Sequence, residues 1–477
     1  MTLATKPSTH PTWANAIAQP AKEFAPTPLP VISGKIPAGL RGSLYRNGPG
    51  RLERGGRKVG HWFDGDGAIL GVHFRDDSTT GVYRFVQTSG YQEETAADKY
   101  LYGNYGMTSP GLIWNQWLRP VKHSANTSVL ALPDKLLALW EGDNPYALDL
   151  ETLETIGLDD LGGLDQGIAY SAHPKIDPNT GEIFNFGVSV KKDVLLNIYK
   201  SDGTGKIIKK SAFKLDGFSI LHDFVLAGQY LVFFIPPVRV NILSLILGLN
   251  SYSDAAKWKP QLGTQVLVFD KDTLTLVSRG ETDPWFQWHF GNGYVDSNGS
   301  IILDIARYED FQTNQFLKEV ATGKTTTTAK GTLWQVNLNP QTGKVTKTEQ
   351  VLDRGCDFPF VSPSEVGQAN RYTYLSVHRQ NVDISKEVLS AIARFDYKTD
   401  TLCEAEVGEN RYASEPIYAI DAYNSEQGWI LTVVYDGNTH ASEVWIFDSD
   451  RLNESPVCKL QLPSVIPLGF HGTWKPA

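Results

Sequence analysis

The sequence predicts an all-β protein whose strands form a closed ring of β-blades, and three observations support this fold class. Short runs of Val, Ile, Leu, Tyr and Phe alternate with turn clusters almost to the end of the chain, while long helical periodicity is scarce. One strand–turn–strand pattern recurs along the chain. Four histidines in similar settings lie so far apart that only a fold joining distant segments could gather them at one site.

The recurring pattern supplies the individual elements. It consists of an apolar strand, an Asp or Asn turn, a Thr-bearing step and a second apolar strand. The clear copies are VLVFDKDTLTLV (266–277), WQVNLNPQTGKVTK (334–347) and IARFDYKTDTLC (392–403), and weaker copies lie at 147–156, 173–186 and 444–452. Each copy is predicted to be the outer hairpin of one blade. Because the copies are degenerate and irregularly spaced, the hairpins of an ordinary β-sandwich remain an alternative on this pattern alone.

The chain of 477 residues is predicted to form one catalytic domain over residues 31–477. A propeller or large barrel can use a chain of this length as a single unit, and the 41% of hydrophobic residues is ample for its core. Residues 1–30 are rich in Pro, Thr and Ala and show weak periodicity. We therefore expect them to form an N-terminal arm over the surface of the domain.

Charge and cysteine content limit the partners and the compartment. The net charge of −9 and the lack of a Lys/Arg block argue against nucleic acid as a partner. Cys356, Cys403 and Cys458 are odd in number and widely separated, which fits a reducing cytoplasm better than a disulfide framework. The N-terminus lacks a signal peptide, and no stretch reaches the roughly 20 apolar residues of a spanning helix. A cytoplasmic protein is expected.

Four histidines predict a metal centre: His173 in SAHPKIDP, His222 in SILHDFVL, His289 in FQWHFGNGYVD and His471 in PLGFHGTW. A single histidine in a β-protein is more often structural, but four with apolar or aromatic neighbours favour a shared role. Structural zinc usually includes cysteine, and catalytic zinc usually has three protein ligands. Four neutral histidines without a carboxylate favour an octahedral ion with open positions. We predict one Fe(II) per chain rather than zinc or manganese.

The remaining histidines are interpreted as structural or exposed: His10, His61, His73, His123, His378 and His440. One of them begins the segment HWFDGDG (61–67), where Asp64 and Asp66 could offer oxygen atoms to a metal. The glycines of this segment favour a tight turn instead.

Three acidic residues stand beside large apolar residues, where an unpaired carboxylate would be costly: Glu141 in LLALWEGDNP, Asp357 in RGCDFPFV and Glu415 in YASEPIYAI. A metal-bound histidine generally donates its other N–H to a carboxylate or carbonyl. These residues are therefore candidates for orienting the ligands. Salt bridges to a buried arginine are the alternative.

The chain resembles the carotenoid cleavage oxygenases, and within them the cyanobacterial apocarotenoid 15,15'-oxygenases. The resemblance covers nearly all of the chain. It rests on GSLYRNGPGR (42–51), HWFDGDGAIL (61–70), ALWEGDNP (138–145), TIGLDDLGG (155–163), SAHPKIDP (171–178), ILHDF (220–224), SEPIY (414–418) and GFHGTW (469–474). The family implies a seven-bladed β-propeller, with loops and short helices forming a dome over an axial Fe(II) held by the four histidines.

The resemblance also assigns residues around the metal. In the family, glutamates hydrogen-bonded to the ligands orient three of them, and the matching positions here are Glu141, Asp357 and Glu415. Asp357 departs from the pattern, because it is one methylene shorter than the usual glutamate. Its hydrogen bond to a ligand is expected to need a backbone shift or a bridging water. Thr127 in SANTSVL matches a position beside an open coordination site on the iron.

The implied reaction is cleavage of a conjugated double bond by O₂ to give two aldehydes. One O₂ supplies the four oxidising equivalents, so no NAD(P)H or flavin is required, and the sequence has no dinucleotide fingerprint. Central cleavage of an apocarotenal to retinal in an apolar tunnel is expected. Eccentric cleavage of intact carotenoids, a stilbene-cleaving oxygenase, a retinoid isomerohydrolase and a propeller used only as an interaction platform are the alternatives.

An insoluble polyene must be extracted from a bilayer, and the apolar run Val240–Leu249 is a candidate for contact with it. The run is too short to span a membrane. Its predicted membrane patch consists of Leu243, Leu245, Ile246, Leu247 and Leu249. A buried loop or dome helix is the alternative. We expect a cytoplasmic monomer in peripheral contact with a membrane, since a closed propeller leaves little free strand edge.

Overall fold

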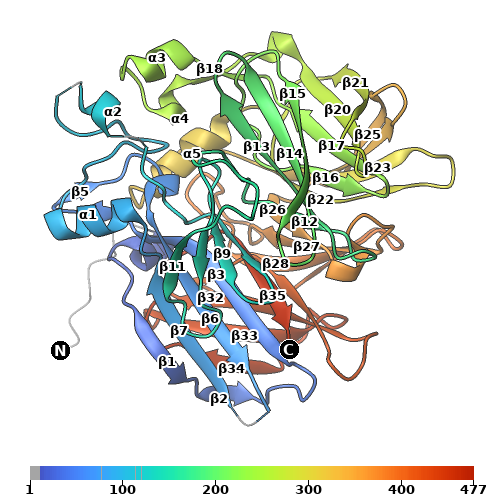
Figure 1. The fold of residues 1–477 in the computed structure, drawn as a ribbon. Coiled ribbons are helices and arrows are strands. Elements are labelled where there is room, and N and C mark those ends of the chain that lie inside the picture. The colour runs from blue at the N-terminus through green and yellow to red at the C-terminus, as the bar shows by residue number, and fades with distance from the viewer. Residues whose placement is uncertain (1–10, 77, 113, 120) are drawn as a thin grey trace.

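The computed structural model describes residues 11–76, 78–112, 114–119 and 121–477, and β-strands dominate it, as predicted (Figure 1). The helices of the described residues are short. They are α1 (Ser89–Ala97), α2 (Asn115–Leu118), α3 (Ile242–Ile246), α4 (Tyr252–Ala255), α5 (Gln312–Val320) and the 3₁₀ helices Thr12–Ile17, Trp62–Asp64, Pro260–Leu262 and Pro363–Glu365. None of the helices in these ranges is long and apolar enough to cross a membrane.

Three of the sheets have four antiparallel strands each. In spatial order they are β11 (Thr155–Leu158), β10 (Tyr146–Leu148), β9 (Leu136–Leu139) and β8 (Ser128–Ala131); β12 (Lys175–Ile176), β13 (Ile183–Val190), β14 (Val194–Ser201) and β15 (Ile207–Lys214); and β26 (Cys356–Phe360), β27 (Tyr372–Val377), β28 (Ala391–Asp396) and β29 (Thr401–Glu404). Strands adjacent in sequence are neighbours in space, which is the meander of a propeller blade.

An eight-stranded sheet consists of two antiparallel halves of four strands each. Its order is β21 (Leu276–Thr282), β20 (Thr264–Asp270), β17 (Tyr230–Ile235), β16 (Val225–Ala227), β22 (Phe286–Val295), β23 (Ile301–Tyr308), β24 (Thr332–Asn339) and β25 (Lys344–Leu352). The halves meet where Ala227 of β16 pairs in parallel with Gly293 of β22.

Two further sheets join the beginning of the chain to its end. One contains β1 (Phe24–Pro28), β7 (Thr79–Phe85), β6 (Asp66–Phe74), β3 (Gly42–Arg51) and β35 (Gly472–Pro476); the other contains β2 (Val31–Gly34), β34 (Cys458–Gln461), β33 (Ala441–Asp448), β32 (Gly428–Asp436) and β30 (Arg411–Ala413), with β31 (Ile417–Ile420) also on β32. Two small hairpins are β4 (Glu53–Arg54) with β5 (Arg57–Lys58) and β18 (Val238–Val240) with β19 (Ala256–Trp258). The pairing of β3 with β35 brings His471 back to the start of the fold.

The predicted hairpins are present with one exception. Segments 266–277, 334–347 and 392–403 coincide with the antiparallel pairs β20–β21, β24–β25 and β28–β29. The weaker copies at 147–156 and 173–186 coincide with β10–β11 and β12–β13. Segment 444–452 contains only the end of β33, and the partner strand β34 begins later, at Cys458.

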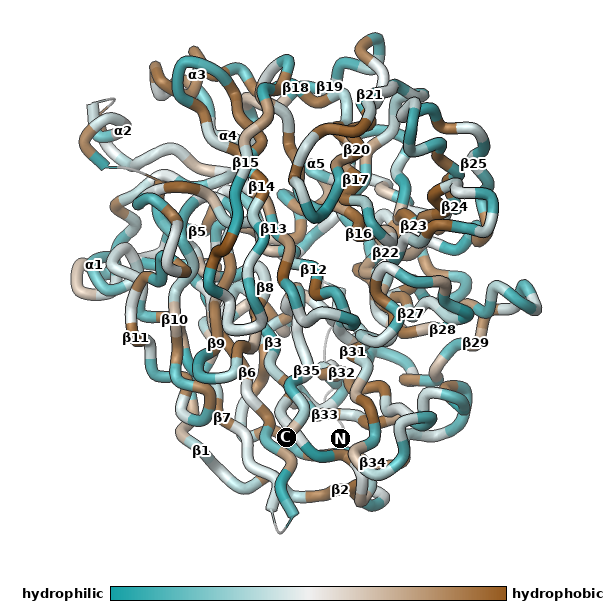
Figure 2. Tube along the Cα trace, turned by 45° about the vertical axis from the view of Figure 1, so that its right-hand side comes forward, coloured by the Kyte–Doolittle hydropathy of each residue, from teal (hydrophilic) through white to brown (hydrophobic). Residues whose placement is uncertain are grey.

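The fold is propeller-like, but its sheets do not divide into seven separate blades. In the described residues six sheets have four or more strands, because the β16–β22 contact joins two four-stranded halves into one sheet. Hydrophobic residues lie along many of the strands (Figure 2). They fill the space between neighbouring sheets: Phe186 and Leu196 of one sheet pack with Phe233 and Leu267 of the next. Each sheet therefore buries its apolar residues against its neighbours.

The short helices and their loops form a cap whose parts are hydrogen-bonded to one another. We use "cap" for α4, α5, residues 61–64 and residues 104–105. The amide of Ser253 donates to Tyr105 O at 2.7 Å, and Asn314 Nδ2 donates to Ser253 Oγ at 2.9 Å. The ring of Phe63 contacts Trp288, which in turn contacts His222, with centroids 5.5 and 5.1 Å apart. The cap thus lies beside the histidine residues.

Candidate metal centre

The structure brings His173, His222, His289 and His471 together, with ligand atoms that all lie within 4.8 Å of one another. His289 is part of β22, and His471 directly precedes β35. His173 and His222 lie in the loops just before β12 and β16. All four side chains are buried. The convergence is a consequence of sheet packing, since no two of these residues are close in sequence.

The Nε2 atoms point toward a common centre. They are 2.9 Å apart for His173 and His222, 3.2 Å for His222 and His289, and 3.1 Å for His289 and His471. With metal–nitrogen bonds of about 2.1 Å, ligands at 90° place their nitrogens about 3.0 Å apart and tetrahedral ligands about 3.4 Å apart. The observed spacing suits one ion with neighbouring ligands near 90°, the angle of an octahedral site.

The protonation of two of the four histidines also suits a metal. Burial, together with the neighbouring imidazoles, holds the pKa of His173 and His471 well below the usual range. Their rings are therefore neutral near pH 7, which is the form that coordinates metals. Burial favours the neutral form of His222 as well, but the adjoining carboxylate of Glu141 outweighs it and raises the pKa of His222.

Three carboxylates meet the outward-facing Nδ1 atoms, one for each of three histidines. Glu141 contacts His222, Asp357 Oδ1 lies 2.8 Å from His289 Nδ1, and Glu415 Oε1 lies 2.9 Å from His471 Nδ1. A carboxylate accepts the Nδ1–H, which fixes the tautomer that leaves Nε2 free to bind a metal. The alternative prediction, a salt bridge between the carboxylate and a buried arginine, holds for one of the three: Glu415 also lies 3.4 Å from Arg46. Burial raises the pKa of Glu415 to about 7 despite that arginine.

His173 is the exception, because its nearest carboxylate is too distant for a hydrogen bond. Asp223 Oδ1 lies 4.0 Å from His173 Nδ1 and is paired at 2.8 Å with Lys175. Asp223 also accepts the amide of Phe290 at 2.9 Å, so it connects the segments that carry His222 and His289. We did not predict Asp223 from the sequence, although its position directly after His222 in an apolar segment was a signal.

Asp357 reaches its histidine directly, and no bridging water is required. A β-bulge between Asp357 and Phe360 and a φ of +52° at Phe358 displace the backbone at this point. Asp357 Oδ2 accepts the hydroxyl of Tyr308 at 2.6 Å. Burial would raise the pKa of Asp357, but His289 and these hydrogen bonds lower it. Tyr308 was also missed from the sequence, because nothing in its local setting indicates this partner.

A cavity of about 540 Å³ adjoins the cluster. His222, His289 and His471 line it, as does Thr127, whose carbonyl accepts the amide of His471 at 3.2 Å. Much of the wall is aromatic: Trp62, Phe63, Tyr105, Trp140, Phe186, Phe218, Tyr252, Trp288, Phe316, Phe358 and Phe470. Such a wall suits an apolar ligand.

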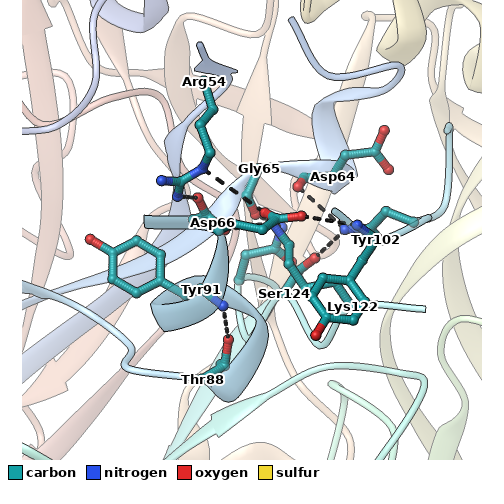
Figure 3. Close-up of polar contacts among 12 residues, drawn as sticks. Arg54, Asp64, Gly65, Asp66, Thr88, Tyr91, Tyr102, Lys122 and Ser124 are labelled. Carbon is teal, nitrogen blue, oxygen red and sulfur yellow. Dashed lines mark hydrogen bonds and ion pairs between the residues drawn. The ribbon is translucent and has the colours of Figure 1, made fainter. Parts of the chain in front are cut away.

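The segment HWFDGDG is a hydrogen-bonded turn in the structure. Asp64 accepts the backbone amides of Gly60, His61 and Gly106, at 3.1, 2.9 and 2.8 Å. Asp66 pairs with Arg54 at 2.9 Å and with Lys122 at 2.6 Å (Figure 3). Both carboxylates are thus saturated by protein donors, which supports the interpretation as a tight turn.

The other histidines lie apart from the cluster. His61, His73, His123 and His378 are buried, and His440 is exposed. His61 caps the 3₁₀ helix Trp62–Asp64, and His123 lies 2.8 Å from Asn144 O. His10 lies outside the described residues. In the described part of the chain, the four clustered histidines are the single group with metal-ligand spacing.

The predicted membrane patch lies on and after α3, and one of its members faces inward. Leu243, Ile246, Leu247 and Leu249 are 64, 61, 42 and 63% exposed. Leu245 instead packs against the buried cluster that contains Trp288.

A second apolar segment adjoins this patch and was not predicted. Trp117 and Leu118 of α2 are 61 and 74% exposed, and Trp117 Nε1 donates to Ile246 O at 2.6 Å. The exposed residues near α2 extend to Val121, which also lines the cavity. The two segments thus meet at Trp117 and Ile246, and exposed apolar residues gathered in this way often mark interaction sites.

Comparison with known proteins places the whole chain in one group. The family model described as "Retinal pigment epithelial membrane protein" matches residues 17–476. An apocarotenoid-15,15'-oxygenase from Synechocystis is 32% identical, over 93% of this chain and 92% of its own. An isoeugenol monooxygenase from Pseudomonas nitroreducens is 27% identical, over 93% and 94%. The crystal structure of cobalt-substituted Synechocystis ACO superposes with a TM-score of 0.87 and 29% identity, covering 98% of both chains.

Proposed function

This chain belongs to the retinal pigment epithelial membrane protein family, which includes the carotenoid cleavage oxygenases, and we propose that it cleaves a conjugated double bond of an apocarotenoid or carotenoid with O₂. The proposed products are two aldehydes, with retinal formed by central cleavage. One observation carries the proposal: four buried histidines direct their Nε2 atoms to one point at the wall of a largely aromatic cavity. Chemistry at a metal and an apolar substrate are thus combined at one place.

We propose that His173, His222, His289 and His471 hold one Fe(II) and that Glu141, Asp357 and Glu415 orient three of them. When bound, the iron supplies the activation of O₂. The reaction balances without a further reductant, because both atoms of one O₂ enter the two carbonyl groups formed from one double bond. No NAD(P)H or flavin is required. For His222, His289 and His471, a carboxylate accepts the proton on Nδ1, which leaves Nε2 free to bind the ion.

The cavity walls bind and orient the polyene in this proposal. Aromatic rings such as Phe63, Trp140 and Trp288 offer flat faces to a conjugated chain and exclude water from the reacting carbons. Thr127 lies against the backbone of His471 and lines the cavity, which supports its placement beside an open position on the iron.

The proposed function is tested by anaerobic loading with Fe(II), followed by incubation with an apocarotenal and ¹⁸O₂ and by mass identification of the products. We expect retinal and a second aldehyde, each carrying one ¹⁸O before exchange with water. Other pairs of aldehydes would support the oxygenase activity but would show that an eccentric double bond is cleaved. Cleavage of a phenolic stilbene alone would support an oxygenase whose substrate is a phenolic stilbene in place of a polyene. No product despite bound iron would contradict the proposal and favour an isomerase or a binding role.

We further propose that the fold is a seven-bladed propeller of residues 31–477, with residues 1–30 as an arm. Dividing the eight-stranded sheet at its parallel β16–β22 contact gives two meanders of four strands each, and the other five large sheets supply the rest. Trp13 is buried against the body of the protein and donates to Lys386 O at 3.0 Å, which supports a bound arm. A monomer is proposed, because the β3–β35 pairing closes the ring.

We propose peripheral contact of a cytoplasmic protein with a membrane through the apolar surface at α2 and α3. Replacing Leu243, Leu247 and Leu249 with serine is expected to reduce sedimentation with phospholipid vesicles several-fold, because each exposed leucine contributes apolar area that inserts between lipids. The matched control is Ile156 and Leu158 to serine, since these residues are similarly exposed on β11. Equal loss of binding in both variants, or no loss in either, would contradict docking through α3.

A further inference from the structure

The carboxylate beside His289 is held in place by a tyrosine. Tyr308 ends β23 and donates its hydroxyl to Asp357 Oδ2 at 2.6 Å, while Asp357 Oδ1 accepts from His289 Nδ1 at 2.8 Å. The amide of Phe358 donates to the same Oδ1 at 2.8 Å. The three side chains Tyr308, Asp357 and His289 thus form one hydrogen-bonded series that ends at the metal centre.

The three carboxylates of the centre are supported in different ways. Glu415 Oε2 accepts the amide of Gly472 at 2.9 Å and faces the guanidinium of Arg46. Glu141 is about one-third exposed to the cavity. Asp357 is buried, and among the described residues no lysine or arginine lies within salt-bridge distance of it. The Tyr308 hydroxyl therefore satisfies the oxygen of Asp357 that would otherwise be an unpaired buried acceptor.

The ring of Tyr308 is itself fixed by its surroundings. It is buried in the cluster that contains Phe286 and Trp288, and Phe286 is its partner in the β22–β23 pairing. Gly331 lies against the ring, where a Cβ would be 2.8 Å from Cζ and 3.0 Å from the hydroxyl oxygen. The ring is thus held in one position, with its hydroxyl within hydrogen-bonding distance of Asp357 and with Thr313 as a further polar neighbour.

We propose that Tyr308 is a positioning residue: it holds the Asp357 carboxylate in the orientation from which this short side chain orients His289. The inference rests on the proposed metal role of the four histidines. Without the hydroxyl, Asp357 can turn about its Cβ–Cγ bond, and the Nδ1–H of His289 loses a fixed acceptor. Partners of this kind affect metal affinity by about 10- to 100-fold when removed.

The test uses Co(II) added to the full-length metal-free protein. Its dissociation constant is measured by competition with a chelator, and the visible ligand-field spectrum reports the ligand geometry. We expect Tyr308→Phe to weaken Co(II) binding about tenfold and to shift the ligand-field bands. The matched control is Tyr374→Phe, another buried tyrosine, in the strand that pairs with β26 but outside the cavity wall, and it should change neither quantity.

A double-mutant cycle with Asp357→Asn distinguishes an action through Asp357 from a general effect on packing. If Tyr308 acts through the carboxylate, Tyr308→Phe adds little to the loss already caused by Asp357→Asn. Unchanged affinity and spectrum in Tyr308→Phe, or fully additive losses in the double variant, would overturn the inference. Failure of the wild-type protein to bind Co(II) would instead overturn the metal centre itself.

A second measurement covers the case in which Tyr308→Phe does not fold. Labelling the wild-type protein with 3-fluorotyrosine makes each phenol a stronger hydrogen-bond donor without removing it. The ligand-field bands are expected to shift on labelling, and not to shift when Asp357→Asn is labelled. Bands that stay unchanged in the labelled wild type would contradict the role of Tyr308.

Discussion

Replacing His289 with alanine is expected to abolish binding of the metal at stoichiometric concentration and to remove cleavage activity. His289 lies between His222 and His471, with Nε2 separations of 3.2 and 3.1 Å. Its loss therefore removes the ligand that adjoins two of the other three. The catalytic contribution of a bound metal amounts to several kcal/mol, so turnover should fall by at least about 10³-fold. Metal content by elemental analysis and product formation from an apocarotenal measure the two effects.

The matched control is His440→Ala, which removes an exposed histidine that is not part of the cluster. It should retain metal and activity. A second comparison is Asp357→Ala, where we expect a smaller loss of affinity of about 10- to 100-fold, because the ligand remains and only its orientation is lost. An active His289→Ala variant with bound metal would show that the four histidines do not form the catalytic centre.

Replacing Lys122 with methionine is expected to lower the free energy of unfolding by about 3–5 kcal/mol. The Lys122 ammonium lies 2.6 Å from Asp66 (Figure 3) and 2.9 Å from Glu94, and all three side chains are buried. With Arg54, which pairs with Asp66, the cluster holds two cations and two anions. Removal of Lys122 leaves the two buried carboxylates with Arg54 as their one remaining cation, 2.9 Å from Asp66 and 4.0 Å from Glu94. The cluster then carries an excess buried negative charge, which is the costly way to break a buried ion pair. Chemical denaturation at one pH measures the loss.

Two variants separate this charge effect from lost packing. Lys122→Met combined with Glu94→Gln removes one charge of each sign, and glutamine can still accept the amides of Leu101 and Tyr102 that Glu94 accepts. The double variant should recover part of the stability. Lys386→Met removes an exposed pair with Asp383 and should cost at most about 1 kcal/mol. Equal losses in the single and double Lys122 variants would show that volume, rather than charge, decides the effect.

The sequence determined the fold class and the position of most hairpins, because both depend on local patterns. Alternating apolar residues specify a strand, and Asp, Asn and Gly specify the turn that follows, so 266–277 and 392–403 could be assigned without tertiary information. The hairpin predicted for segment 444–452 was wrong, because the connection is longer than the pattern assumes. β33 ends at Asp448, and its partner strand begins only at Cys458. The candidate ligands were also identified in the sequence, through their apolar neighbours and a family resemblance.

Only the tertiary structure decided how these segments meet. The Nε2 spacing of the histidines, the direct contact of Asp357 with His289 and the support of Asp357 by Tyr308 join residues of different strands. The apolar run at α3 was visible in the sequence, but its orientation was not: Leu245 packs inward while its neighbours are exposed. Such contacts depend on the register and packing of whole sheets, which arise from many weak non-local interactions and leave no pattern in any single stretch of chain.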